Sequence, residues 1–233
     1  MRGRHSRGSG FGAMHELKDR VLFIDAEAIV IDKPAGLSVH PGPATRRSLE
    51  DHLPELRFGF QRMPAAVHRL DRDTSGCLLL ARHPKAHKRF ARAFEEGLAQ
   101  KSYAAVLEGV PAAEEGSVEL PLSKTSTREA GWRVVPDPSG KRALTRWRVV
   151  AERQGRALVL LTPETGRTHQ LRVHAASGIG VPIAGDPVYG RGGGAMLLHA
   201  LELRLPRAPK PDIEARAPLP PSFAEAGFDD AGL

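Results

Sequence analysis

Residues 67–81 read VHRLDRDTSGCLLLA and place a polar loop between two apolar segments. Val67–Leu70 is extended in pattern, Asp71–Gly76 is polar and ends in glycine, and Cys77–Ala81 predicts a buried strand. The polar side chains are therefore expected in a loop carried by a rigid sheet, where functional sites are commonly built. On pattern alone, a solvated loop with surface ion pairs is the competing interpretation.

A helix is predicted directly after this strand. Pro84 suits a first helical turn, and the helix is expected to run to about Ala99. Its core face would comprise Ala86, Phe90, Ala93, Phe94 and Leu98, which have helical spacing. The opposite face is basic, and we expect it to follow a phosphate backbone through Lys85, Lys88, Arg89 and Arg92.

The rest of the chain is rich in short strand patterns and poor in helices. Strands are expected at 21–25, 29–32, 101–110, 118–122, 132–135, 144–151, 157–162 and 196–205, and further helices at 48–56 and 168–176. Because strands and helices do not alternate strictly, the pattern predicts an α+β fold with a largely antiparallel mixed sheet flanked by helices. We expect a disordered basic arm over 1–16, one catalytic domain over 17–205 and a Pro-rich tail over 206–233, either an extended strap or disordered.

Composition narrows the class of partner. The 233 residues include a single cysteine, Cys77, which excludes a disulfide framework and a Cys-based metal site and fits a reducing cytoplasm. No apolar run approaches the ~20 residues of a membrane span, so no membrane association is expected. A net charge of +7 and a pI near 10.0 favour a polyanionic partner, of which nucleic acid is the commonest.

A second polar cluster lies at residues 164–174, which read ETGRTHQLRVH. Thr168 is a fair N-cap for the following helix, and Gly166 allows close approach of a ligand to the backbone. Gln170 and His174 lie four residues apart and share one helix face. A capped helix with solvated polar side chains is the alternative interpretation of this cluster.

Together the two clusters resemble the signatures of RluA-type RNA pseudouridine synthases, HRLD-x-x-TSG and GRTHQ-[IL]-R-V-H, in the same order. The resemblance extends from about Val21 to Leu205 and includes DKPAG at 32–36, KSY at 101–103 and GDPVYG at 185–190. It implies a pseudouridine-synthase-like catalytic domain, in a short form without an S4 domain. It also implies isomerisation of uridine to pseudouridine in structured RNA, either tRNA or large-subunit rRNA, by a monomer that needs neither metal nor organic cofactor.

The resemblance also implies residue roles. Asp71 matches the catalytic aspartate, Tyr103 the tyrosine that stacks on the target base, and Arg172 the arginine that pairs with the carboxylate. Arg69 matches the residue that fills the gap left by a flipped nucleotide. Further substrate contacts are expected from His68 in the first cluster and from Arg167, His169 and Gln170 in the second.

Physical chemistry is consistent with these roles. A base inside a stack is inaccessible, so the nucleotide must be flipped out, at a cost of a few kcal/mol. An always-charged arginine can occupy the vacancy, and an aromatic ring can support the base. A buried carboxylate needs a neighbouring guanidinium to stay ionised as nucleophile or base. Proton removal from C5 needs only a modest base, for which Tyr103 or water would serve.

Two other function classes compete with the isomerase. A non-catalytic RNA-binding protein on the same fold would be favoured if Asp71 or Tyr103 were absent, and both are present. A hydrolase such as an RNA N-glycosidase would need a second acid at a fixed separation, and no other acid has comparable context. The sequence leaves open whether Asp71 attacks C1′, attacks C6 or abstracts a proton.

Overall fold

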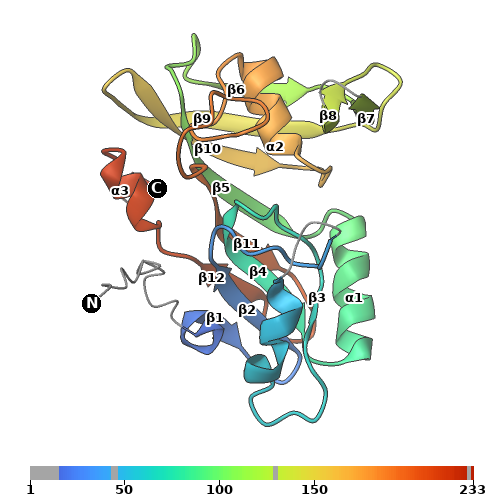
Figure 1. Cartoon of the computed structure of the whole chain (residues 1–233). Helices are drawn as coiled ribbons and strands as arrows, with labels where there is room; N and C mark the ends of the chain where they lie inside the picture. The colour runs from blue at the N-terminus through green and yellow to red at the C-terminus, as the bar shows by residue number, and fades with distance from the viewer. Residues whose placement is uncertain (1–15, 43–46, 128–130, 230–231) are drawn as a thin grey trace, which may run out of the picture.

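The computed structural model describes residues 16–42, 47–127, 131–229 and 232–233 and shows one long mixed sheet (Figure 1). The strands are β1 Val21–Ile24, β2 Ala28–Lys33, β3 Ala65–Ala66, β4 Ser75–Ala81, β5 Gln100–Leu107, β6 Glu115–Glu119, β7 Leu122–Thr127, β8 Gly131–Pro136, β9 Leu144–Arg153, β10 Arg156–Pro163, β11 Leu198–Leu205 and β12 Ile213–Arg216. The helices are η1 Leu17–Arg20, η2 Leu49–Leu56, α1 Pro84–Glu95, α2 Gln170–Val173, η3 His174–Ile179 and α3 Pro221–Glu225.

Ten of these strands form the main sheet. Its order is β1-β2-β4-β11-β5-β10-β9-β6, with β3 added to β4 and β12 added to β11, while β7 and β8 form a separate hairpin. Among the described strands, only β4 and β11 pair in parallel. The predicted α+β fold with a largely antiparallel mixed sheet is confirmed, and two pairs of strands predicted next to each other in the sequence form the hairpins β1–β2 and β9–β10.

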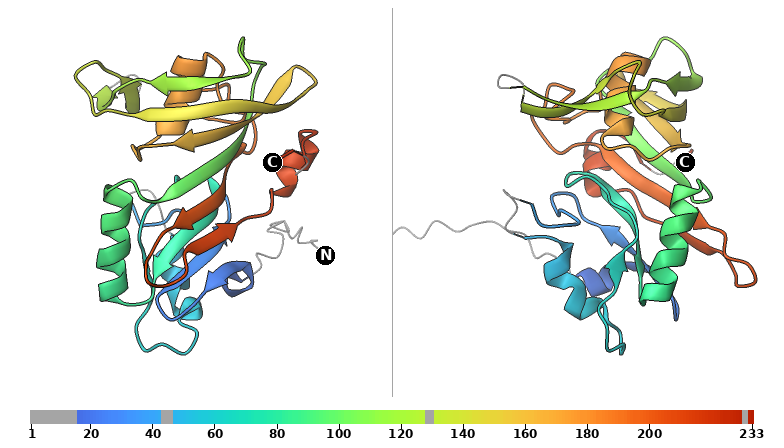
Figure 2. Two further views of the ribbon diagram at one scale, coloured as in Figure 1. Left: turned by 180° about the vertical axis from the view of Figure 1, so that it is seen from behind. Right: turned by 90° about the vertical axis from the view of Figure 1, so that its right-hand side faces the viewer.

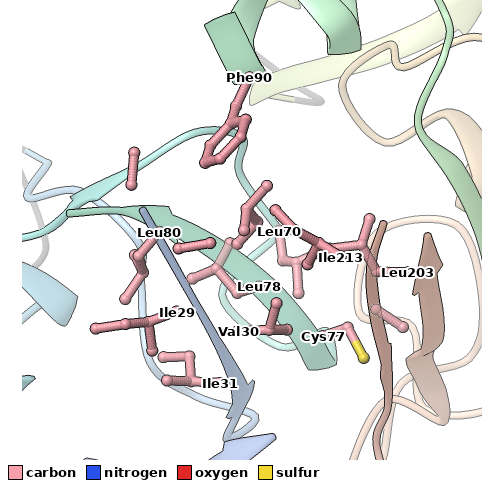
Figure 3. Close-up of a cluster of buried hydrophobic side chains, with 14 of the residues drawn as sticks. Ile29, Val30, Ile31, Leu70, Cys77, Leu78, Leu80, Phe90, Leu203 and Ile213 are labelled. Atoms are coloured by element: carbon pink, nitrogen blue, oxygen red, sulfur yellow. The ribbon is translucent and has the colours of Figure 1, made fainter. Parts of the chain in front are cut away.

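One core cluster fills the space between α1 and the strands β2 and β4 (Figure 3). All residues of β2 and β4 are buried, because these strands lie inside the sheet and are covered on both faces. Phe90 from α1 reaches this cluster, and Ile213 brings in β12. The buried β4 supports the polar loop that precedes it.

Helix α1 ends earlier than predicted. His83 Nδ1 accepts the N–H of Ala86 at its start, as an N-cap does. At its end Gly97 adopts a φ of 74°, its N–H donates to Phe94 O, and the N–H of Leu98 donates to Ala93 O. This glycine-based C-cap turns the chain away after Glu95, so Leu98 is 50% exposed and the prediction that it belongs to the core is wrong.

The helix predicted at 168–176 begins two residues later in the structure. Thr168 is not its N-cap: α2 starts at Gln170 and follows His169, which has a left-handed φ of 53°. The helix then widens into a π-helical turn, η3. Thr145 Oγ1 nevertheless bonds both Gln170 and His174, which confirms that these two side chains share one face.

The segment after Pro206 is more ordered than its proline content suggested. Its strand β12 pairs with β11, and Phe223 of α3 and the following Phe228 are each only 1% exposed. They pack in a core cluster with Val106 of β5 and Leu201 of β11, on the flank of the molecule away from α1 (Figure 2). The expected basic arm lies outside the described residues, apart from Glu16.

No helix among the described residues has both the length and the apolar character needed to cross a membrane.

We predict that Phe223→Ala lowers the free energy of unfolding by about 3–5 kcal/mol, because it empties a closed apolar site. Urea denaturation followed by circular dichroism measures the change. Glu225→Ala, on the exposed side of α3, is the matched control and should cost under about 0.5 kcal/mol. A loss below about 1 kcal/mol for Phe223→Ala would show that the C-terminal segment does not belong to the cooperative core.

Candidate active site

The two polar clusters of the sequence meet at a cavity of about 440 Å³. The loop before β4 contributes His68, Arg69 and Asp71, and the segment before and within α2 contributes residues 163–172. Tyr103 and Lys101 of β5 form another wall, and the C-terminal end of α1 closes it. A second cavity of about 480 Å³ shares Arg69 and Asp71 with the first and extends between the loops 38–42 and 187–188.

Asp71 is held by an arginine that is itself clamped. Arg172 Nη1 donates to Asp71 Oδ2 at 3.2 Å. The Nε and Nη2 of Arg172 donate to the two carboxylate oxygens of Asp186, both at 2.7 Å. Such bidentate geometry fixes the plane of a guanidinium. Asp186 and Arg172 are buried, whereas the Asp71 side chain keeps 19% of its surface exposed toward the cavity.

Burial and ion pairing have opposite effects on the pKa values of the clamp formed by Arg172 and Asp186. Burial raises the pKa of Asp186, but Arg172 and the N–H groups of Val188 and Tyr189 outweigh it and hold that pKa below its ordinary value. Burial lowers the pKa of Arg172, and the carboxylates of Asp186 and Asp71 more than reverse this. The clamp is therefore charged throughout the neutral range. Asp186 lies within the GDPVYG segment, and the sequence alone assigns it no role.

His169 approaches Asp71 from the other side. Its Nε2 lies 3.8 Å from Asp71 Oδ2, and its Nδ1 lies 2.9 Å from the Tyr189 hydroxyl, which accepts the N–H of Val134 at 3.0 Å. Burial lowers the pKa of His169 more than Asp71 raises it, so the imidazole is neutral at pH 7. Its left-handed φ is uncommon outside glycine and is a strain typical of functional sites.

An exposed tryptophan lies beside His169. Trp132 on β8 is 48% exposed, and its ring contacts that of His169 edge to face at 5.1 Å, whereas Trp147 is buried. It adds an aromatic rim close to Asp71.

Tyr103 lies in the wall of the cavity. It sits on β5, between Leu161 of β10 and Ala200 of β11. Burial, with the nearby Asp71 charge, raises its pKa well above the ordinary value. The phenol therefore stays protonated, which suits a stacking surface better than a base.

His68 and Gln170 line the cavity but use their polar atoms within the protein. His68 Nε2 accepts the N–H of Leu79 at 3.1 Å, and its ring stacks on Phe94 at 4.6 Å. Gln170 Oε1 accepts from Thr165 and Arg167, and its Nε2 donates to residues 144 and 145. Through these bonds both residues hold the loops that carry Arg69, Asp71 and Arg167, and the substrate contacts expected of them stay predictions.

The expected cationic contacts lie at the rim. Arg69 is exposed, lines both cavities, and has no hydrogen bond or ion pair within the described part of the chain. Arg167 is exposed, and its Nε donates to Arg142 O at 3.0 Å. On α1, Lys85 and Lys88 are exposed. Two other members of the predicted phosphate track are engaged in ion pairs, Arg89 with Glu27 at 2.6 Å and Arg92 with Glu96 at 2.7 Å.

A buried lysine holds the loop that carries Asp71 through hydrogen bonds to backbone carbonyl groups. Lys33, at the end of β2, is fully buried, and its Nζ donates to Pro34 O at 2.8 Å, Leu37 O at 2.9 Å and Arg72 O at 3.1 Å. Burial lowers the pKa of Lys33 to about 7. This role was not predicted from the sequence. The signal for it is the charged pair Asp32 and Lys33 at the end of an apolar strand.

Comparison with known proteins identifies relatives of the whole arrangement. The RNA pseudouridylate synthase family model matches residues 27–177. An uncharacterised RNA pseudouridine synthase of Zymomonas mobilis is 56% identical over 216 residues, which cover 91% of this chain and 99% of that protein. The ribosomal large subunit pseudouridine synthase D of Nitrosomonas europaea is 38% identical over 195 residues, 81% of this chain but 54% of that protein.

Among solved structures, human RNA pseudouridylate synthase domain containing 4 superposes with a TM-score of 0.76 at 26% identity. The match covers 90% of this chain and 92% of that one.

We predict that the stability of the protein depends on the neutral form of His68. Burial lowers the pKa of His68 to about 3, against about 6.5 in the unfolded chain. The folded state therefore binds fewer protons between these values, and stability is lost as the pH falls from about 6.5 towards 3. His68→Gln keeps an acceptor for Leu79 and does not titrate. At pH 5 the wild type should lose up to about 2 kcal/mol more than this variant, relative to pH 7.

Urea denaturation at the two pH values measures this difference. His40→Gln, at an exposed histidine, is the control and should keep the wild-type loss. Equal losses in His68→Gln and the wild type would contradict the prediction.

Proposed function

The chain belongs to the RNA pseudouridylate synthase family and isomerises uridine to pseudouridine in RNA, and on this premise we propose that Asp71 is its catalytic residue. The observation that carries the proposal is the fixed Asp186–Arg172–Asp71 arrangement, with the Asp71 carboxylate at the junction of two cavities. The reaction breaks the N1–C1′ bond, turns the base and forms the C5–C1′ bond. Attack at C1′, attack at C6 and proton abstraction each require an ionised carboxylate at this point.

We assign the substrate-facing roles to Tyr103, Arg69, Arg167 and His169. Tyr103 supports the flipped uracil, for which base–aromatic stacking is worth about 1–3 kcal/mol. Arg69, unpaired and adjacent to both cavities, fills the space that the flipped nucleotide leaves and contacts phosphates. Arg167 contributes charge at the rim, and neutral His169 offers a polar edge beside Asp71 without adding positive charge.

We propose large-subunit rRNA as the substrate, acted on by a cytoplasmic monomer. Two relatives are named as ribosomal large subunit pseudouridine synthases D, at 37% and 38% identity. This chain spans only 56% and 54% of their length, so their substrate supports the proposal without deciding it. Transfer RNA is the other substrate class left open. Chemical mapping of pseudouridine in total RNA from cells with and without this protein identifies the RNA and the position.

Asp71→Asn should abolish turnover, because the amide keeps the size of the side chain but removes the charge and the nucleophile. We expect no detectable tritium release from an rRNA transcript labelled with 5-tritiated uridine, while the affinity for this RNA stays within about threefold, since phosphate contacts dominate binding. Asp73→Asn is the matched control, because Asp73 pairs with exposed Arg72 and not with Arg172. Turnover of Asp71→Asn within tenfold of wild type would assign catalysis to another residue.

Asp186→Asn should lower kcat by at least about 100-fold and leave KM within a few-fold. The amide no longer neutralises Arg172, so the guanidinium is free to move, and displacement of a catalytic group by about 1 Å costs on that order. The double variant Asp186→Asn/Arg172→Met should be no slower than Arg172→Met alone, because both changes remove the same clamp. Additive losses in the tritium-release assay would show that Asp186 acts independently of Arg172.

A further inference from the structure

A loop far from the cavity exposes aromatic and basic side chains together. Residues 57–63 read RFGFQRM and connect η2 to β3. Phe58 is 42% exposed, Phe60 37% and Met63 53%. Arg57 and Arg62 are exposed as well, and the segment contains no acidic residue. Scattered exposed apolar side chains are ordinary, but several of them together in one short segment mark an interaction surface.

The loop is held in shape rather than left free. Buried Arg82 donates from Nη2 to Arg57 O at 3.0 Å and Phe58 O at 3.1 Å, and from Nη1 to Asp25 O at 2.7 Å. Its guanidinium lies 3.7 Å from the centre of the Phe60 ring. Phe58 has a φ of 44°, a strained conformation for a bulky residue. The bonds from Arg82 hold this strained backbone in place, and strain of this kind clusters at functional sites.

The position of this loop separates it from the catalytic cavity. Arg82 immediately precedes α1, so the loop sits at the N-terminal end of that helix, whereas Phe94 and Gly97 at the other end line the cavity. Figure 1 shows this loop, in cyan, at the lower pole of the molecule. A helix of 12 residues is about 18 Å long. The exposed Lys85 and Lys88 of α1 lie between the two places.

The charges around the loop favour an anionic partner. Asp25 and Glu27 lie at its base, and both carboxylates are already paired. Arg207 binds both of them, and Arg89 and Lys210 also bind Glu27. They therefore do not oppose the approach of phosphates to Arg57 and Arg62.

We infer that residues 57–63 form a second RNA-binding surface, on which Phe58 and Phe60 stack unpaired bases while Arg57 and Arg62 contact phosphates. The inference rests on the RNA-directed activity described above and adds a recognition element to it. Interleaved aromatic and basic side chains are the usual chemistry of single-strand binding, because every base offers a π-face. RNA bound at the cavity and passing the lysines of α1 reaches this loop, so the surface selects RNA that carries an unpaired segment at that distance.

A crosslinking experiment on the intact wild-type protein tests the contact directly. The probe is an oligouridine of about 20 nucleotides, longer than the roughly 4–16 that one single-strand groove covers, with 4-thiouridine throughout. After irradiation and digestion, mass spectrometry should find crosslinked nucleotides on Phe58 or Phe60. Crosslinks confined to residues that line the two cavities would overturn the inference.

Two double variants test how much Phe58 and Phe60 contribute to RNA affinity. Phe58→Ser/Phe60→Ser should weaken binding of the fluorescein-labelled oligouridine at least about tenfold, since one stacked base is worth about that factor or more. On a large-subunit rRNA transcript, KM should rise about tenfold while kcat at saturating RNA stays within twofold. Phe58→Tyr/Phe60→Tyr keeps the rings and should bind as the wild type does. Val110→Ser controls for loss of an exposed apolar side chain elsewhere.

The remaining outcomes are distinct. Unchanged affinity and KM in the serine variant would overturn the inference. A wild-type dimer in sedimentation equilibrium that the serine variant converts to monomer would also overturn it and assign the surface to self-association. If the wild type forms no pseudouridine in the transcript or in total RNA, the proposed substrate fails; the crosslink still reports separately on the loop.

Discussion

The bidentate pair between Arg172 and Asp186 is the interaction on which the rest of the site depends. A buried guanidinium is costly unless its donors are satisfied, and Asp186 engages two of them while itself lying fully out of solvent. The third donor group of the guanidinium, Nη1, then points at Asp71, which is the most exposed member of the trio. One pair thereby joins three segments: the loop before β4, the helix α2 and the turn that follows residue 185. A change in any of them would displace the Asp71 carboxylate, which we propose as the catalytic group.

The parallel pairing of β4 with β11 in the sheet fixes the point from which the Asp71 loop extends. β4 and β11 pair in parallel where Ser75 meets His199 and Gly76 meets Ala200, and the Ser75 hydroxyl lies 2.8 Å from His199 Nδ1. Gly76 has a φ of 103°, and a Cβ there would lie 2.2 Å from Ala200 O, so this position requires glycine. The Asp71 loop therefore leaves the sheet at a fixed point, braced by Lys33 below. The glycine that ends the first signature is thus a packing requirement of the sheet.

The sequence predicted those parts of the molecule whose signals are local. The strand predicted at Cys77–Ala81, which begins two residues earlier in the structure, the start of α1 at Pro84 and the antiparallel pairs follow from apolar runs and turn residues. The site residues Asp71 and Arg172 came from the resemblance to a family, and the structure brings them together. What the sequence left undetermined depends on contacts between distant segments. A polar residue next to a signature looks the same in sequence whether it faces a ligand or the protein itself: His68 Nε2 accepts the N–H of Leu79, 11 residues away, and Gln170 Nε2 donates to Leu144 O, 26 residues away. The C-terminal segment was underestimated for the same reason, because two phenylalanines among prolines form a core only where β5 and β11 provide its other half.

The polar groups of the site fall into two physical classes, and these classes divide its work. Asp186, Gln170, Lys33 and His68 are buried or nearly so, and their hydrogen bonds stay within the protein. Salt screens such interactions weakly, so they hold the geometry of Asp71 constant over a wide range of ionic strength. Arg69, Arg167, Lys85 and Lys88 are exposed, and the RNA contacts that we propose for them would weaken steeply with salt through counterion release. With these proposed roles, RNA affinity depends on exposed charges at the rim and varies with ionic strength, whereas the chemical step depends on buried groups and does not. The strained loop at residues 57–63 belongs to neither class, since stacking on its rings removes apolar surface from water and survives salt that disperses the phosphate contacts.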